Sequence, residues 1–159
     1  MTTVMVMGTA MVEATAQVVS PTGGHTVTVT DGGDVTLTAQ AFVSNTVSAK
    51  AAQSGFGNFG MGASIALNIG ETDTDAVIGR DVVLSGAHDL SLSASSSNRL
   101  STVAEGGAGG KTAITPVFAL SVSDNDTNAV IHGGSAISAS GAVSATAQHE
   151  GGVSASAKG

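Results

Sequence analysis

Cysteine, tryptophan and tyrosine are absent from this chain of 159 residues, and proline occurs only twice. The lack of cysteine excludes disulfide bonds and thiolate-bound metals. Aromatic residues make up 3% of the chain, which leaves no aromatic platform of the kind on which polysaccharide lyases and hydrolases stack sugars. No serine lies in a GxSxG elbow either, so we expect no enzymatic activity and no catalytic residues.

Charged side chains are scarce too, at 11% of the chain, against roughly 25% in typical soluble domains. The net charge is −7, and the five basic residues are scattered singly. Nucleic acids and anionic lipid surfaces are bound by clustered cations, so neither is an expected partner. No run of 18 apolar residues is present, so we expect no membrane insertion.

What the chain has instead is alternation of Val, Leu, Ile or Ala with Ser or Thr. Residues 25–30 (HTVTVT), 90–93 (LSLS) and 136–140 (AISAS) are clear instances, and clusters of Gly, Asp and Asn separate such runs. A period of two residues predicts half-buried strands, and the clusters predict turns. The sequence therefore predicts an all-β protein with a core of small side chains.

The chain also repeats itself, with a period of about 55 residues. Residues 66–78 (ALNIGETDTDAVI) match residues 119–131 (ALSVSDNDTNAVI), and the pentapeptides VTLTA, LSLSA and VSATA recur at 35–39, 90–94 and 143–147. A fixed period is typical of stacked arrays, in which each unit buries its apolar face against the next.

These matches divide the chain into four parts of one solenoid segment. Residues 1–34 form the tail of a preceding repeat, 35–89 and 90–142 are two repeats, and 143–159 begin another. We expect a right-handed parallel β-helix (β-solenoid) in which each repeat makes two or three turns, with the three pentapeptides in register on one sheet. An antiparallel β-sandwich is the alternative, because dense short strands fit it equally well.

The alternation also predicts which side chains form the core. Those expected to point inward are, in the first repeat and then the second, Val35, Leu37, Ala39, Ile65, Leu67, Ile69, Val77, Ile78, and Leu90, Leu92, Ala94, Phe118, Leu120, Val122, Val130, Ile131. The glycine-rich stretches 55–60 and 106–110 predict turns or places where two chain segments approach closely.

Two aligned acidic segments are the best candidates for a binding site. Glu71, Asp73 and Asp75 in one repeat correspond to Asp124 and Asp126 in the next, and clustered carboxylates suit Ca²⁺. Their spacing matches neither an EF-hand loop nor the calcium-binding nonapeptide, and Asp is common in turns. We therefore expect no metal and no cofactor, with calcium at these five residues as the alternative.

Histidine and threonine give weaker indications. His25, His88, His132 and His149 show no metal-ligand spacing, and we expect them at exposed turns. A T-x-T pattern at 26–30 and 36–38 suits an ice-binding solenoid surface, but later copies replace Thr with Ser at most equivalent positions. Ice binding is therefore an alternative function rather than the expected one.

The repeats resemble those of very large bacterial surface proteins of the haemagglutinin-like or adhesin-like kind. The resemblance rests on residues 63–95 (ASIALNIGETDTDAVIG…VVLSGAHDLSLSAS) and on their echo in 116–148 (PVFALSVSDNDTNAVIH…AISASGAVSATAQ). It implies a β-solenoid stalk, and an extracellular or cell-surface location, although residues 1–12 lack the charged start of a signal peptide.

The expected function is accordingly structural. The segment should span distance and associate through its ends, with flanking repeats or further copies of the chain as partners and filaments as the product. Calcium-dependent adhesion and ice binding are the alternatives. Uncovered apolar rows at Val4, Val6, Val143 and Val153 are expected to mark the two ends.

Overall fold

A computed structural model describes residues 2–18, 26–29, 32–52 and 57–159. Every helix or strand assigned within these residues is a β-strand, which confirms the all-β prediction. All strand pairs among them are parallel, so the antiparallel sandwich is wrong.

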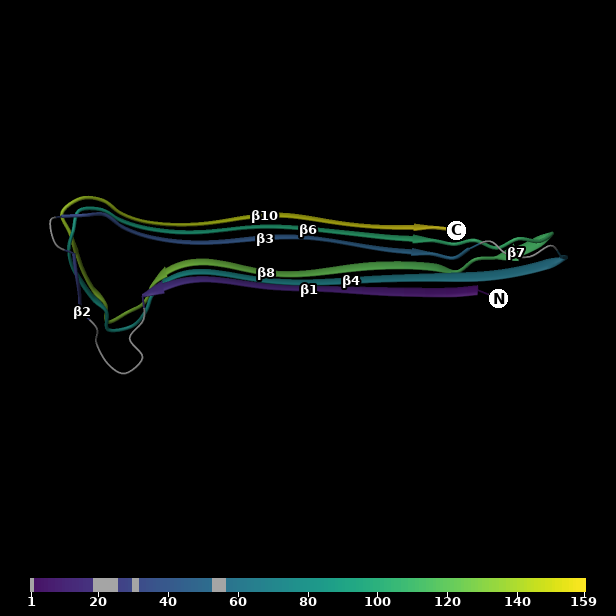
Figure 1. The fold of residues 1–159 in the computed structure, drawn as a ribbon, viewed down its shortest axis with the longest axis horizontal. Coiled ribbons are helices and arrows are strands. Elements are labelled where there is room, and N and C mark those ends of the chain that lie inside the picture. Colours follow the sequence, from purple (N-terminus) through teal and green to yellow (C-terminus); the bar gives the residue numbers. More distant parts are fainter. Residues whose placement is uncertain (1, 19–25, 30–31, 53–56) are drawn as a thin grey trace.

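The strands form two long sheets and one short sheet. Sheet A contains, in spatial order, β1 (Thr2–Val18), β4 (Phe59–Ile78) and β8 (Val117–Ile131), and β7 (Thr112–Ile114) also pairs with β4. Sheet C contains β3 (Val35–Lys50), β6 (Leu90–Glu105) and β10 (Val143–Lys158). Sheet B contains β2 (Thr26–Thr28), β5 (Val83–Ala87) and β9 (Ala136–Ala139). Sheets A and C run as two long layers, and sheet B crosses between them at one end (Figure 1).

The register within the sheets follows the sequence repeat. Leu90 lies opposite Val35 on one side and Val143 on the other, which confirms that the three pentapeptides share one sheet in register. Apart from the short β7, each of the two complete repeats supplies one strand to each sheet, and the expectation of two or three turns per repeat is wrong. The reason is strand length, because β4 has 20 residues and β6 has 16, so one passage through the three sheets uses a whole repeat.

The core lies between sheets A and C and is apolar mainly near sheet B. Leu37, Ala39, Leu90, Leu92 and Ala94 are buried there as predicted. Ile78 of β4 joins this cluster, with Val35 and Ile131 packed against it, which also agrees with the prediction. A second, smaller cluster consists of Val47, Ala49, Ala66 and Ala104.

The predicted inward face of sheet A is wrong for most of its length. The residues that lie on its outer face instead are Ile65, Leu67, Ile69, Val77, Phe118, Leu120, Val122 and Val130. The inner row of β4 carries smaller side chains such as Ser64, Ala66 and Thr72. A Cβ atom at Gly70 would lie 3.0 Å from Leu100 Cδ2, which shows how closely the two sheets approach.

Polar side chains occupy the middle of the interior, between the two apolar clusters. Asn45 Nδ2 donates to Asn68 Oδ1 at 2.8 Å, and Asn68 Nδ2 donates to the Asn45 carbonyl at 3.2 Å. Asn98 Nδ2 donates to Ser123 Oγ at 3.1 Å and to Asn125 Oδ1 at 2.5 Å. Buried amides need such partners, so these bonds tie sheet A to sheet C where apolar contact is thin.

The glycine-rich stretch 106–110 is a place of close approach, as predicted. A Cβ atom at Gly62 of β4 would lie 2.1 Å from the carbonyl oxygen of Gly107. A Cβ atom at Gly60 would lie 2.0 Å from the carbonyl oxygen of Gly109. The segment packs against β4 with backbone on backbone, which only glycine permits. Residues 55 and 56 of the other stretch lie outside the described residues.

Candidate interaction face on sheet A

The five predicted acidic residues lie together on the outer face of sheet A. Glu71 is opposite Asp124, Asp73 is opposite Asp126, and Asp75 is opposite Asn128. Strand β1 extends the middle row, because Glu13 is opposite Asp73. Adjacent strands are about 4.8 Å apart, so carboxylates stack into an acidic ladder defined here as Glu13, Glu71, Asp73, Asp75, Asp124 and Asp126.

The acidic ladder does not converge on a point. Among the described residues, no three of its carboxylates bring oxygen atoms within 4.8 Å of one another. Asp75 Oδ1 instead accepts a hydrogen bond from Asn128 Nδ2 of the neighbouring strand at 2.9 Å. Like charges directly opposite one another are unfavourable in a sheet, so the ladder attracts cations diffusely rather than enclosing one.

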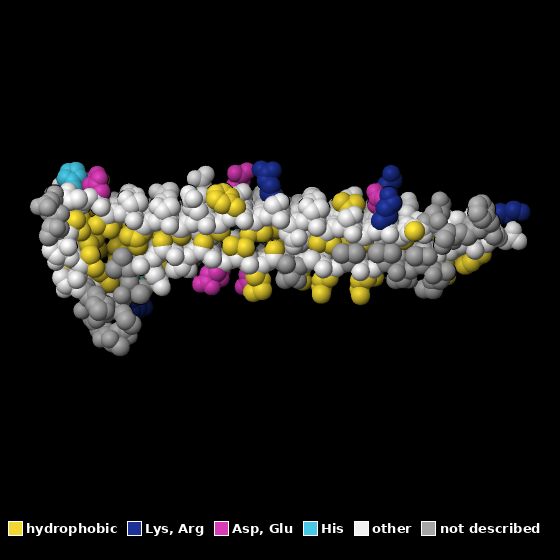
Figure 2. Space-filling model, in the orientation of Figure 1, with side chains coloured by type: hydrophobic (Ala, Val, Ile, Leu, Met, Phe, Trp, Pro, Cys, Tyr) yellow, Lys and Arg dark blue, Asp and Glu magenta, His cyan; other side chains and the backbone are white. Residues whose placement is uncertain are grey.

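An apolar block lies beside the acidic ladder on the same face. It is defined by three rows across β1, β4 and β8, each in register: Met5–Ile65–Phe118, Met7–Leu67–Leu120, and the pair Ile69–Val122. Met5 is 74% exposed and Phe118 is 54% exposed. Figure 2 shows hydrophobic side chains standing out along the lower edge, where sheet A runs in Figure 1, with carboxylates to their left.

Sequence reasoning identified the β4 and β8 residues of this block but placed them on the wrong face, and it did not identify Met5 and Met7. No sequence signal locates them, because the row between them, Ser64, Ala66 and Asn68, is no more apolar than the outer row and yet is fully buried. Because its large apolar side chains are exposed and adjacent, this block is a candidate interaction surface.

The C-terminal strand β10 is exposed on both of its faces. Its inner row continues the buried row of β6, because Val143 lies opposite Leu90 and Val153 opposite Leu100. Leu90 and Leu100 are buried, whereas Val143 and Val153 are 52% and 54% exposed. This agrees with the predicted uncovered row at that end. The side chains of Val4 and Val6 lie outside what the structure describes.

The three described histidines occupy two different environments. His88 and His132 lie at exposed turns, as predicted, whereas His149 lies within β10, where its Nδ1 is 2.6 Å from Ser96 Oγ. His25 is outside the described residues.

At the far end of sheet C, Lys50 Nζ lies 2.9 Å from Glu105 Oε2. The hydrogen bond from Lys50, and then its charge, hold the pKa of Glu105 below its usual value. In the same way, Glu105 raises the pKa of Lys50. Both side chains are well exposed, so this pair adds little stability.

No protein-family model matches the chain, and comparison with curated proteins and with solved structures finds no match. Within the described residues there is no helix long and apolar enough to cross a membrane.

Proposed function

We propose that this chain is a right-handed parallel β-helix segment with a structural role in an extracellular, adhesin-like fibrous protein, and that it associates end to end. Its partners are flanking repeats or further copies of the same chain. The role needs no catalysis and no cofactor.

Support for the β-helix comes from the order in which the chain visits the sheets. It passes from sheet A to B to C three times, as β1–β2–β3, β4–β5–β6 and β8–β9–β10, and every passage stacks on the one before. Parallel crossover connections are right-handed in about 98% of cases, which supports the proposed hand.

The observation that carries the structural role is the open inner row of β10. The equivalent residues of β6 are buried because a strand of the next passage, β8, lies across from them. In a stacked copy, β1 would pair with β8 and cover this row, and β3 would pair with β10. Unpaired strand edges favour this addition, and head-to-tail stacking does not close, so it yields filaments.

Light scattering and electron microscopy over a range of concentrations test the proposal. The unmodified chain should give fibres or oligomers of distributed length. Ala147→Lys places a charge in the open inner row of β10 and should leave single particles, whereas Thr146→Lys, on the outer face of the same strand, should still assemble. A chain that stays monomeric at every concentration overturns end-to-end association, and a monomer that halts ice growth supports the ice-binding alternative.

Calcium-dependent adhesion is the second candidate, favoured by the acidic ladder beside the apolar block. Because the carboxylates do not converge, we expect melting temperatures in chelator and in millimolar calcium to agree within about a few degrees. A larger upward shift that is lost in both Asp73→Ala and Asp126→Ala would support the adhesion alternative.

A further inference from the structure

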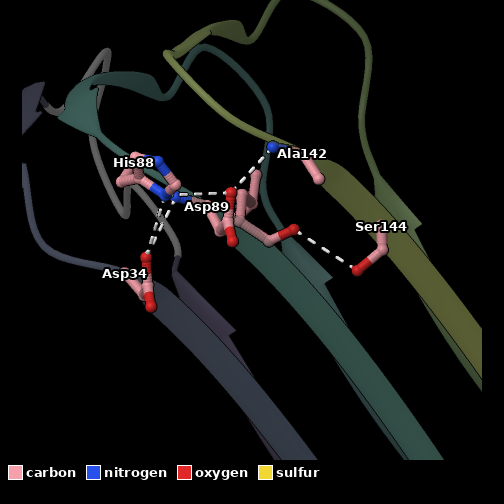
Figure 3. Close-up of polar contacts among 6 residues, drawn as sticks. Asp34, His88, Asp89, Ala142 and Ser144 are labelled. Atoms are coloured by element: carbon pink, nitrogen blue, oxygen red, sulfur yellow. Dashed lines mark hydrogen bonds and ion pairs between the residues drawn. The ribbon is translucent and has the colours of Figure 1, made fainter.

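Three potential metal ligands meet at the turn that precedes sheet C. Asp34 lies just before β3, and His88 and Asp89 lie just before β6, the neighbouring strand (Figure 3). His88 Nδ1 is 3.1 Å from Asp89 Oδ1 and 3.6 Å from Asp34 Oδ1, and one ligand atom from each residue lies within 4.8 Å of the other two.

These separations fit a single small cation. Ligand atoms bound at about 2.0–2.2 Å to a tetrahedral ion are roughly 3.3 Å from one another, between the two distances found here. Two carboxylates also balance the charge of a divalent ion, and imidazole favours zinc and its neighbours over calcium. We propose that Asp34, His88 and Asp89 form a site for a divalent transition-metal ion, with Zn²⁺ as the representative, and that solvent completes its coordination.

Backbone groups already hold both carboxylates in place. Asp34 Oδ1 accepts the N–H of Asp89 at 3.2 Å, and Asp89 Oδ1 accepts the N–H of Ala142 at 2.8 Å. A carboxylate has about four lone-pair positions, so one such bond leaves capacity for a metal. The carboxylates are therefore oriented before any ion arrives, and little ordering remains to be done on binding.

Glycine at position 141 keeps the site open. Gly141 lies beside His88 at the equivalent position of the next passage, and its N–H donates to the His88 carbonyl at 2.7 Å. A Cβ atom at Gly141 would lie 2.0 Å from Asp89 Oδ1 and 3.0 Å from His88 Cε1, so a side chain there would displace both ligands. The third passage has Gly141 and Ala142 where the second has His88 and Asp89, so the site joins β3 to β6 alone.

A metal at this site would link the starts of two neighbouring strands, β3 and β6, through ligands that are far apart in sequence. It would therefore raise the stability of the folded chain, independently of whether chains associate end to end. This separates its test from that of the proposed function.

Titration of ZnCl₂ into the chelator-treated full chain, by calorimetry and thermal melting, tests the site. We expect one equivalent of zinc per chain and a melting temperature raised by about 5 °C or more at 100 times the Kd. Asp34→Asn retains an oxygen for the Asp89 N–H, and His88→Ala removes the imidazole. Each should weaken zinc binding by ~10-fold or more, because even a residue that only supports a ligand costs 10–100-fold.

His132→Ala is the matched control, since His132 is also exposed at a turn but lies outside the cluster. Its zinc affinity should equal that of the unmodified chain, and zinc should shift the ring resonances of His88 and not those of His132 in NMR spectra. Circular dichroism of the metal-free variants checks that they fold. Absence of saturable zinc binding, or unchanged affinity in folded Asp34→Asn and His88→Ala, would show that the cluster is only an ion pair and overturn the proposal.

Discussion

Replacing Leu92 with alanine should lower the free energy of unfolding by about 2–5 kcal/mol, the range for a leucine removed from a packed core. Leu92 is 1% exposed and lies in β6, the central strand of sheet C. It packs in the cluster that also contains Leu37, Ile78 and Leu84. Strands β4, β5 and β6 around it are each paired on both sides, so they cannot close the cavity that the substitution leaves.

Leu120→Ala is the control, because Leu120 is the same residue type on the outer face of sheet A and is 40% exposed. Leu120→Ala should lower the free energy of unfolding by about 1 kcal/mol or less. Urea unfolding followed by circular dichroism measures both variants. Equal losses at Leu92 and Leu120 would mean that sheet A has the opposite face inward, since a shift of one residue exchanges the faces.

Replacing Gly86 with alanine should destabilise the protein by about 2–5 kcal/mol. Gly86 lies in β5, where the pairing with β9 is irregular, and its φ is 80°. A side chain is strained in this left-handed region. A Cβ atom there would also lie 2.2 Å from the backbone oxygen of Val29, which can move only if the chain beside β2 moves with it.

Gly133→Ala separates this effect from the general cost of losing a glycine. Gly133 follows β8, and a Cβ atom there would meet no atom within 4 Å. The change should alter the free energy of unfolding by about 0.5 kcal/mol or less. Thermal melting of both variants provides the comparison, and a Gly86→Ala protein as stable as Gly133→Ala would contradict the backbone contact described here.

Sheet C could be predicted from the sequence because its two faces differ in chemistry. Leu37, Leu90 and Leu92 alternate with Thr or Ser, so only one choice buries apolar surface. In β4 both faces carry apolar residues, with Ile65 and Leu67 on one and Ala66 and Ile78 on the other. Alternation identifies two faces in such a strand but does not say which one is inside.

The acidic ladder was only partly predictable. The repeat aligned Asp73 with Asp126, and the register confirmed that they are neighbours. It gave no indication that Glu13 joins them, because the similarity between the first strand and β4 is too weak to see. The Asp34–His88–Asp89 cluster cannot be predicted from residue spacing along the chain, because its ligands come from successive passages of the chain.

By itself the sequence determined the strand type, the repeat and the register of sheet C, because these depend on period, turn residues and recurrence along the chain. The tertiary structure decided the rest: the large side chains of sheet A lie outside, Asn68 and Asn98 are buried, and the turn before sheet C gathers ligands. The first two depend on the distance between sheets A and C, and the third depends on the pairing of β3 with β6 within sheet C. At Gly70 the sheets approach so closely that Leu100 of sheet C fills the space between them, and along β4 a large side chain, Ile78, fits inside only next to sheet B.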